Sequence, residues 1–212
     1  MILDPAKYEA WYRTPRGRWI SQAEFRLMTR QLQPQSGSTL LDVGCGTGHF
    51  TRQFAALGLH TTGIDPDARA ISFARQQGGP VTYLGGSGID VPFRDASFDY
   101  CIAITSLCFI SDFETSIAEM WRVSRKAIVL GLLNRSSLLY EQKFGRGEYL
   151  GARWDTYKEI SPVIRSLDPK YLTMNHGTAV FLPYRGVLPR VVEAVLPNSL
   201  PFGGFLSICL CK

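Results

Sequence analysis

The 212-residue sequence has no apolar run near the roughly 18–20 residues that a membrane-spanning helix needs. Its first residues lack the basic segment and following apolar segment of a secretion signal. It also has no block of like charges, because the 23 basic and 18 acidic residues behind its net charge of +5 are dispersed. These absences predict a cytoplasmic globular protein that does not associate with membranes, and they argue against a nucleic-acid-binding surface.

Cysteine is sparse, with only Cys45, Cys101, Cys108, Cys209 and Cys211. The odd number, and the apolar runs around three of them, argue against a disulfide framework. Cys209 and Cys211 have the spacing of a metal pair, but also that of one face of an apolar strand, so we interpret them as small buried hydrophobes. No Cys/His cluster has ligand spacing, and we therefore expect no metal.

Apolar runs alternate with helical periodicity along the chain, which predicts an α/β fold with a mostly parallel sheet covered by helices on both faces. Strands are expected at 39–43, 60–65, 81–84, 98–105, 126–133, 171–182 and 202–211. Helices are expected in 5–33 (one or two, separated at 14–17), 49–57, 66–77, from 111, 136–144, 156–167 and 188–196, with a loop at 145–151. The spacing from Ser111 to Glu114 suggests a capping box, and Pro162 suggests a bent or broken helix.

A glycine-rich stretch, Leu40-Leu-Asp-Val-Gly-Cys-Gly-Thr-Gly48, follows the first expected strand and opens a helix. Backbone N–H groups converge there on a ligand that glycine allows to approach closely. A dinucleotide fingerprint would need glycine where this chain has His49, and a P-loop would need a Gly-Lys-Ser/Thr that is missing. Asp42 is unsuited to a pyrophosphate but suits an ammonium group, so the loop predicts a different ligand.

Asp65 lies 23 positions after Asp42, at the end of the second expected strand. A carboxylate in that position lies beside the glycine loop and can accept hydrogen bonds from two ribose hydroxyls. Its alternative role is a helix cap, since it directly precedes Pro66. The combination with the glycine spacing favours a cofactor site.

Several stretches together resemble the class I S-adenosylmethionine-dependent methyltransferases, in their small-molecule, type 11-like branch. They are Leu41-Asp-Val-Gly-Cys-Gly-Thr-Gly48, Gly63-Ile-Asp-Pro66 and Val91-Pro-Phe-Arg-Asp-Ala-Ser-Phe-Asp99, with weaker likeness at 5–27 and 200–206. The resemblance implies a Rossmann-like, doubly wound, seven-stranded sheet whose last strand is antiparallel, with an N-terminal helical lid. It also implies a single methyltransferase domain over 1–212, divided into a lid at 1–36, a cofactor-binding half at 37–134 and an acceptor side with closing strands at 135–212.

The resemblance assigns S-adenosylmethionine as cofactor and S-adenosylhomocysteine as product. Asp42 and the backbone of the glycine loop would surround the methionine moiety, Asp65 would hold the ribose, and Pro66 would lie against the adenine. The expected cofactor-binding residues are Tyr8, Trp11, Asp42, Gly44, Cys45, Gly46, Gly48, Asp65, Pro66, Ser87, Gly88, Ile89, Ile104 and Thr105.

Two positions depart from the family pattern. Ser87 stands where relatives usually place an acidic residue against the adenine amino group, so the serine hydroxyl or the backbone near Gly88 and Ile89 would take over. Cys108-Phe109 stand where many relatives carry one or two histidines, so the general base often proposed there is missing. We interpret Cys108 as a buried thiol rather than a nucleophile.

The catalytic residues stay unknown at this point. Tyr140 and Glu141 lie where relatives build the acceptor pocket, although both also fit an ordinary exposed helix face. His176 is the third acceptor-side candidate, and a structural role is its alternative. The aromatic side chains Tyr8 and Trp11 fit either a lid over the cofactor or plain packing, and we favour the lid.

The resulting hypothesis is methyl transfer from S-adenosylmethionine to an unidentified small-molecule acceptor by a monomer or homodimer. Two alternatives stay open. A nucleic-acid methyltransferase would usually show Asn/Asp-Pro-Pro-Tyr/Phe where this chain has Ile104-Thr-Ser-Leu107. The missing histidines also allow a non-catalytic domain that binds S-adenosylmethionine or its product and acts through a partner, and the intact glycine loop does not argue against it.

Overall fold

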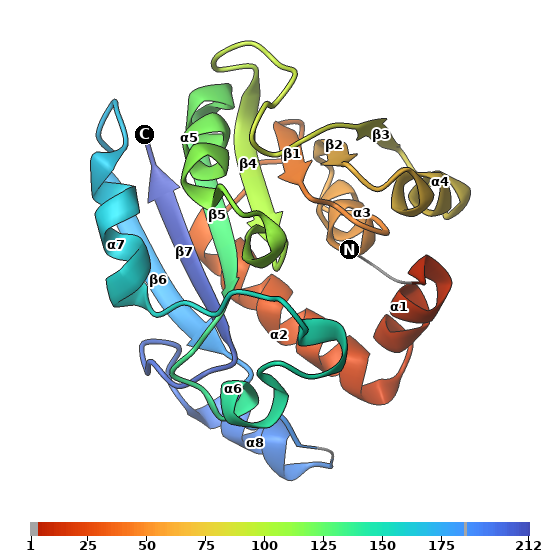
Figure 1. Ribbon diagram of the computed structural model, residues 1–212, viewed down its shortest axis with the longest axis vertical. Coiled ribbons are helices and arrows are strands. Elements are labelled where there is room, and N and C mark those ends of the chain that lie inside the picture. Colours follow the sequence, from red (N-terminus) through yellow and green to blue (C-terminus); the bar gives the residue numbers. More distant parts are fainter. Residues whose placement is uncertain (1–3, 185) are drawn as a thin grey trace.

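The computed structural model describes residues 4–184 and 186–212, so residues 1–3 of the expected lid segment lie outside the described residues. Its core is a seven-stranded sheet with the strand order β3-β2-β1-β4-β5-β7-β6 (Figure 1). The strands are β1 (Thr39–Val43), β2 (His60–Asp65), β3 (Val81–Gly85), β4 (Phe98–Ile104), β5 (Ser124–Leu133), β6 (Thr173–Ala179) and β7 (Phe205–Cys211).

The first five strands are parallel, and β7 runs antiparallel to both neighbours, β5 and β6. This arrangement confirms the predicted fold class. The strand order reverses between β1 and β4, and in open parallel sheets ligands bind at the carboxyl ends of the strands beside such a reversal. The glycine-rich stretch directly follows β1 and therefore begins at this position.

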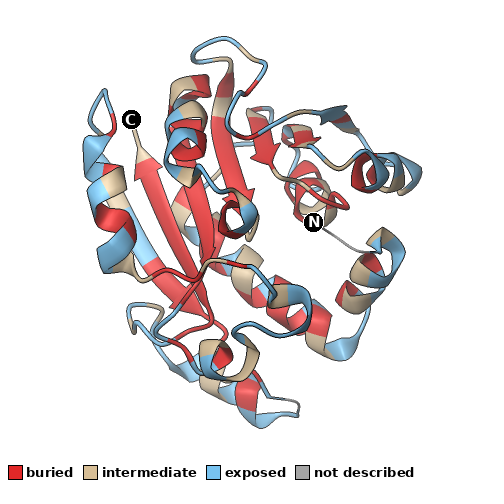
Figure 2. Cartoon of the chain, in the orientation of Figure 1, coloured by how far each residue is buried: buried red, intermediate tan, exposed pale blue. Residues whose placement is uncertain are grey.

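Helices cover both faces of the sheet because residues alternate in direction along β1 and β4. On one face, Leu41 and Val43 pack with α5 (Phe113–Val123) and α7 (Tyr157–Ser166); on the other, Leu40 packs with α2 (Pro15–Leu32) and α3 (His49–Ala55). The central strands are accordingly buried, while the outer turns of the helices are exposed (Figure 2). The helices are α1 (Pro5–Tyr12), α2 (Pro15–Leu32), α3 (His49–Ala55), α4 (Ala68–Gln76), α5 (Phe113–Val123), α6 (Leu138–Lys143), α7 (Tyr157–Ser166) and α8 (Leu188–Val195), with 3₁₀ turns η1 (Leu107–Phe109) and η2 (Gly147–Tyr149).

Two local predictions need correction. The N-cap of α5 is Asp112, whose carboxylate accepts the Thr115 N–H, so no capping box starts at Ser111. Of the two possibilities at Pro162, a bend or a break, the break is wrong, because α7 continues through this residue; its first turn is fixed by a capping box between Thr156 and Glu159. The predicted loop at 145–151 is present and contains the short turn η2. No helix in the described part of the chain is long and apolar enough to cross a membrane.

Candidate functional site

The loop after β1 depends on glycine at two positions. Gly44 and Gly48 have left-handed φ values of 73° and 74°. A Cβ atom would lie 2.4 Å from the Ser106 Cβ at Gly44 and 2.1 Å from the Tyr83 hydroxyl oxygen at Gly48. The backbone N–H groups of Gly44 and Cys45 both donate to the Ile64 carbonyl of β2. The loop is therefore a tight turn with a fixed path, held against β2.

Asp42 lies on β1 beneath the start of α3. Its carboxylate is buried and accepts a 2.7 Å hydrogen bond from the Thr51 hydroxyl. Burial raises the pKa of this carboxyl from 3.8 to about 7, although the Thr51 hydrogen bond opposes the shift. No basic side chain pairs with it among the described residues, so Asp42 is a carboxyl whose ionised form lacks a counter-charge within the chain.

Asp65 ends β2 and its carboxylate ties two turns together. One oxygen accepts the Gly46 N–H at 2.9 Å, and the other accepts the Asp67 N–H at 2.8 Å. Burial raises the pKa of Asp65, and these two hydrogen bonds oppose that change. The side chain of Asp67, not that of Asp65, caps α4, so the helix-cap alternative for Asp65 is wrong. Asp65 instead binds the glycine loop directly.

The segment after β3 closes against the end of β1. Gly88 is buried, and a Cβ atom there would lie 2.9 Å from a Val43 methyl group. Ser87 is exposed, and its hydroxyl accepts the Ile89 N–H at 3.3 Å. Ser87, Gly88 and Ile89 thus lie at the same edge of the sheet as the glycine loop, with the serine hydroxyl used locally.

The end of β4 lies beside the glycine loop. Thr105 has a left-handed φ of 50°, and the neighbouring Ser106 hydroxyl donates to the Val43 carbonyl at 2.7 Å. Ile104 is buried just before them. The Cys108 thiol contacts the Thr105 carbonyl at 3.1 Å, and burial raises its pKa to about 12, which agrees with an inert thiol.

Helix α1 is attached to the glycine loop by a buried acid that sequence reasoning missed. The Glu9 carboxylate accepts the Thr47 hydroxyl at 2.7 Å and an Arg52 N–H at 2.6 Å. Burial opposes ionisation of Glu9, yet contacts with His49, Thr47 and Arg52 hold its pKa below the usual value. The Tyr12 ring also stacks on His49, with centroids 3.6 Å apart. Glu9 lies in the stretch 5–27 that resembles the family, but that likeness did not indicate this contact, which only the fold reveals.

The expected aromatic residues of α1 lie near this attachment. The hydroxyl oxygens of Tyr8 and Tyr12 are 3.0 Å apart, and Trp11 packs edge-on against Tyr12 with ring centroids 5.0 Å apart. Tyr8 and Trp11 are half-buried. Since Tyr12 also stacks on His49, the structure brings Tyr8 close to the side of the glycine loop.

The three acceptor-side candidates are not brought together. Tyr140 is half-buried on α6 and packs against Trp154, whereas Glu141 is exposed. His176 is exposed on the edge strand β6, where its ring stacks on Tyr157 of α7 at 4.1 Å. His176 therefore lies several strands away from β1 and the glycine loop.

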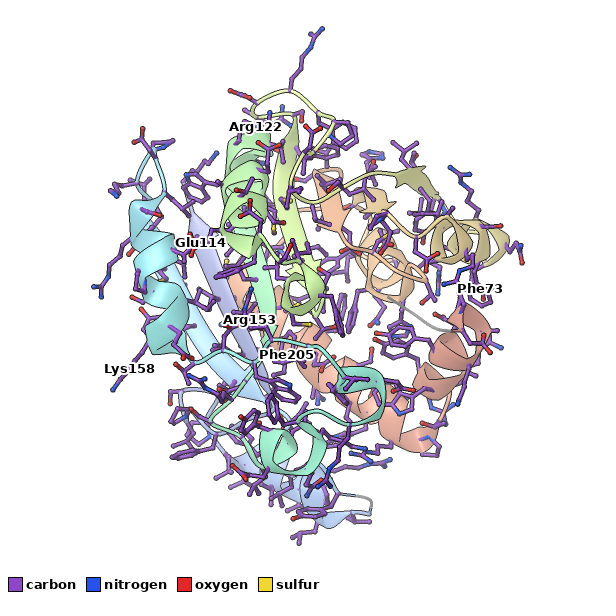
Figure 3. The ribbon with its side chains drawn as sticks, viewed as in Figure 1. Phe73, Glu114, Arg122, Arg153, Lys158 and Phe205 are labelled. Atoms are coloured by element: carbon purple, nitrogen blue, oxygen red, sulfur yellow. The ribbon has the colours of Figure 1, made fainter. Side chains whose placement is uncertain are left out.

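A short extended segment after η2 closes the region beyond β4. The backbone N–H of Arg153 donates to the Cys108 carbonyl at 2.8 Å, and the Arg153 guanidinium lies 3.4 Å from the centre of the Phe113 ring. Arg153 is labelled in Figure 3. This contact fixes Trp154 next to η1 and α6. Among the residues described, no group of three or more His, Cys, Asp and Glu side chains is arranged to hold a metal ion.

Comparison with known proteins identifies the family. A model of the methyltransferase domain matches residues 41–129. The O-methyltransferase rstn1 of Aspergillus nomiae is 38% identical over 162 residues, which cover 73% of this chain and 70% of that protein. The malonyl-[acyl-carrier protein] O-methyltransferase of Yersinia pestis is 36% identical over 93 residues, or 44% of this chain. The chain spans only 35–38% of the length of that protein and two others of the same name.

A solved structure from Thermotoga maritima has the same fold. It is described as a methyltransferase dependent on S-adenosylmethionine, possibly a histamine N-methyltransferase. It superposes with a TM-score of 0.76 at 24% identity and covers 98% of this chain and 95% of its own. Three observations agree on the family: the matched family model, the relative that is covered over 70% of its length, and the strand order. The chain belongs to the class I S-adenosylmethionine-dependent methyltransferases.

Proposed function

We propose that this chain binds S-adenosylmethionine over the glycine loop and transfers its methyl group to a small-molecule acceptor. The observation that carries the proposal is the placement of Asp65, which ends β2 and accepts the Gly46 N–H of the loop. That geometry leaves a half-buried carboxylate at the carboxyl edge of the sheet, beside the turn that a ligand would approach.

The chain's own residues fit this cofactor. Asp42 and Asp65 flank the loop, and neither has an ion-pair partner among the described residues, as expected for groups that receive an ammonium and two ribose hydroxyls. The glycines of the loop let the turn pack close to β2, and because they have no side chains they leave room for a ligand above the turn. The proposed contacts are Asp42 and the loop backbone at Gly44, Cys45, Gly46 and Gly48 for the methionine moiety, Asp65 for the ribose, Pro66, Ser87, Gly88 and Ile89 for the adenine, and Ile104 and Thr105 beneath the sulfonium.

Bound S-adenosylmethionine supplies a methyl group that is already activated. The contribution of the chain is to align that group with the acceptor and to exclude water. In this proposal, residues 1–36 form a lid. Helix α1 is the part of the lid that Glu9 attaches to Thr47 of the glycine loop. Residues 37–134 would hold the cofactor and 135–212 the acceptor, within one domain that acts in the cytoplasm as a monomer or homodimer.

Calorimetric titration with S-adenosylhomocysteine tests the proposal. The wild-type chain should bind it in the micromolar range, about −8 kcal/mol, and should not bind NAD equally well. Asp65→Ala should lose about 1.5–3 kcal/mol of binding free energy, the range for hydrogen bonds to a charged group. Asp67→Ala is the matched control, because it removes a neighbouring carboxylate that caps α4. Absence of binding, or equal losses in both variants, would contradict the proposed site.

Turnover tests the enzymatic half of the proposal separately. Labelled S-adenosylmethionine, offered with a broad panel of small acceptors, should yield labelled product. Binding without turnover on any acceptor would favour the alternative of a non-catalytic domain.

A further inference from the structure

A long groove runs along α2, on the face of the sheet that this helix covers. One wall is α2 from Pro15 to Gln31, and the other is formed by β6, α8 and residues 196–199. The buried side chains of Trp19 and Leu27 contribute to its lining. The groove has a volume of about 1310 Å³, above the roughly 300–1,000 Å³ of small-molecule pockets. It is therefore large enough to hold a polypeptide segment.

Arginine dominates the charge of this groove. Four guanidinium groups line it, those of Arg18, Arg26 and Arg30 on α2 and that of Arg190 on α8. Among the described residues that line it, Glu193 is the only acid. Its carboxylate already accepts two backbone N–H groups, at 2.8 Å and 3.1 Å. Positive charge therefore exceeds negative charge in the lining, and the single carboxylate is engaged elsewhere.

None of the four guanidinium groups has an acidic partner in the described part of the chain. Arg30 donates to the side-chain oxygen of Asn198 at 3.1 Å, and Arg190 donates to a backbone carbonyl at the start of α2 at 3.3 Å. Both acceptors are neutral. No hydrogen bond or ion pair among the described residues involves the exposed side chains of Arg18 and Arg26. The chain itself therefore does not neutralise the positive charge of the groove.

The three arginines of α2, which we call the arginine row, share one line of the helix surface. Arg18, Gln22, Arg26 and Arg30 follow one another at intervals of four residues, and all four are exposed. Like charges four residues apart on a helix repel each other, as in the pair Arg26 and Arg30. Arg18 also lies where the first turn of α2 ends, and the positive end of the helix dipole disfavours a cation there. An anionic ligand in the groove would relieve both unfavourable interactions.

The wall formed by α8 adds exposed apolar side chains. Val195 is 74% exposed and Leu196 is 36% exposed, and both line the groove. Single-stranded nucleic acids stack their bases on aromatic side chains, but no exposed Phe, Tyr or Trp occurs among the described lining residues. Successive side chains of an extended polypeptide point in opposite directions. A polypeptide that alternates carboxylates with apolar side chains therefore matches the two walls better than a nucleic acid does.

We propose that this groove binds an acidic, partly apolar segment of a partner protein in an extended conformation. The part of α2 that lines the groove is about 24 Å long, which corresponds to about seven residues of extended chain. The carboxylates of the segment pair with the arginine row, and its apolar side chains contact Val195 and Leu196. None of the residues lining the groove belongs to the proposed cofactor site, so this surface adds partner binding to the proposed function and does not depend on it.

Fluorescence anisotropy with labelled peptides tests the proposal. The probe is a peptide of about eight residues that alternates Glu with Leu, and the comparison peptides carry Gln or Lys in place of every Glu. We expect the Glu peptide to bind the wild-type chain at least tenfold more tightly than the Gln peptide, a difference of about 1.4 kcal/mol, and the Lys peptide to bind most weakly. The preference should decrease as NaCl is added, because salt screens exposed charges.

Charge reversal in the groove sharpens the test. Arg18→Glu/Arg26→Glu should exchange the preference, so that the Lys peptide binds more tightly than the Glu peptide. Both arginine side chains are exposed and make no hydrogen bond or ion pair among the described residues, so we expect the variant to fold, which thermal unfolding checks. Arg94→Glu/Arg165→Glu is the matched control, because it reverses two exposed arginines outside the groove and should keep the wild-type preference.

Several outcomes would overturn the docking surface. Equal binding of the Glu and Gln peptides, or an unchanged preference in Arg18→Glu/Arg26→Glu, would do so. Loss of the preference in the control variant would show that net charge attracts the peptide, not the groove. Tighter binding of a single-stranded RNA or of inorganic triphosphate than of the Glu peptide would make the groove a phosphate site. Binding of S-adenosylhomocysteine is measured separately, so each of these results leaves the proposed function intact.

Discussion

The two sides of the site treat their polar groups in opposite ways. Around the glycine loop, the carboxylates of Glu9, Asp42 and Asp65 all have hydrogen-bond partners within the chain. Beyond β4, next to η1 and α6, the buried indole N–H of Trp154 has none among the described residues. The carboxylates of one side are therefore hydrogen-bonded within the chain, although Asp42 and Asp65 have no ion-pair partner among the described residues, whereas the other side keeps a buried donor without a partner.

This difference separates two tasks of a transferase. A cofactor site that binds one molecule gains from a geometry fixed in advance, because less ordering is needed on binding. An acceptor site gains discrimination from polar groups that only the correct ligand can satisfy, since any other ligand leaves them buried and unpaired. Stability should therefore depend strongly on the paired side, and ligand selectivity on the unpaired side.

The largest effect is expected from Glu9→Ala. Removing this carboxylate leaves Arg52 and the Thr47 hydroxyl without their partner and detaches α1 from the glycine loop. We expect the free energy of unfolding to fall by about 2–3 kcal/mol, as for other hydrogen bonds to a buried charge. Urea denaturation measures this, with the exposed acid Glu114 as the control; Glu114→Ala should change stability by less than about 0.5 kcal/mol. Similarly small losses of unfolding free energy in Glu9→Ala and Glu114→Ala would mean that the hydrogen-bonded side of the site does not stabilise the fold.

An intermediate effect is expected from Asp42→Asn, and its sign depends on pH. The folded pKa of Asp42 is raised to about 7, so the stability that this carboxyl contributes is complete below its ordinary pKa of 3.8 and is lost as the pH rises through about 7. Asparagine does not ionise and escapes that loss. As the pH is raised from about 6 to about 8, the free energy of unfolding of the variant should therefore increase by about 1 kcal/mol relative to that of the wild type. Thermal unfolding at the two pH values checks this; a constant difference would show that Asp42 does not titrate there.

The smallest effect is expected from Ser87→Asp. Ser87 is exposed, and its hydroxyl only contacts the nearby Ile89 N–H, so an acidic side chain can be accommodated. Affinity for S-adenosylhomocysteine should stay the same or improve, because the family resemblance implies an acid at this position. Calorimetry measures the change. A tenfold loss, about 1.4 kcal/mol, would mean that the segment after β3 meets the adenine with another geometry.

The sequence was most informative where the structure is local. Strands β1 to β5 and the glycine loop follow from short-range periodicity and from spacing, and the predicted elements lie within a few residues of those observed. The alternative of a helix cap at Asp65 lay two positions before the actual cap of α4, because Asp65 and Asp67 are equally suitable by type. Backbone geometry decides between them.

Glu9 could not be predicted in the same way. It is a single acid on a short helix, and a sequence alone places such a residue on an exposed helix face. Glu9 reaches Thr47 across 38 positions of the chain. Such a role arises from packing between distant segments, which periodicity does not encode. His176 illustrates the reverse case, since its residue type suggested chemistry and its place on the edge strand gives it a stacking role.

The strand order also has a consequence for protein synthesis. Within the described sheet, β6 pairs only with β7, which follows it in the chain, so β6 has no place in the sheet until β7 has been translated. Strands β1 to β5 can pair with one another earlier, as the chain leaves the ribosome. The residues of β6 (Thr173–Ala179) would then emerge before the strand that pairs with them, so this edge of the sheet forms last, together with β7.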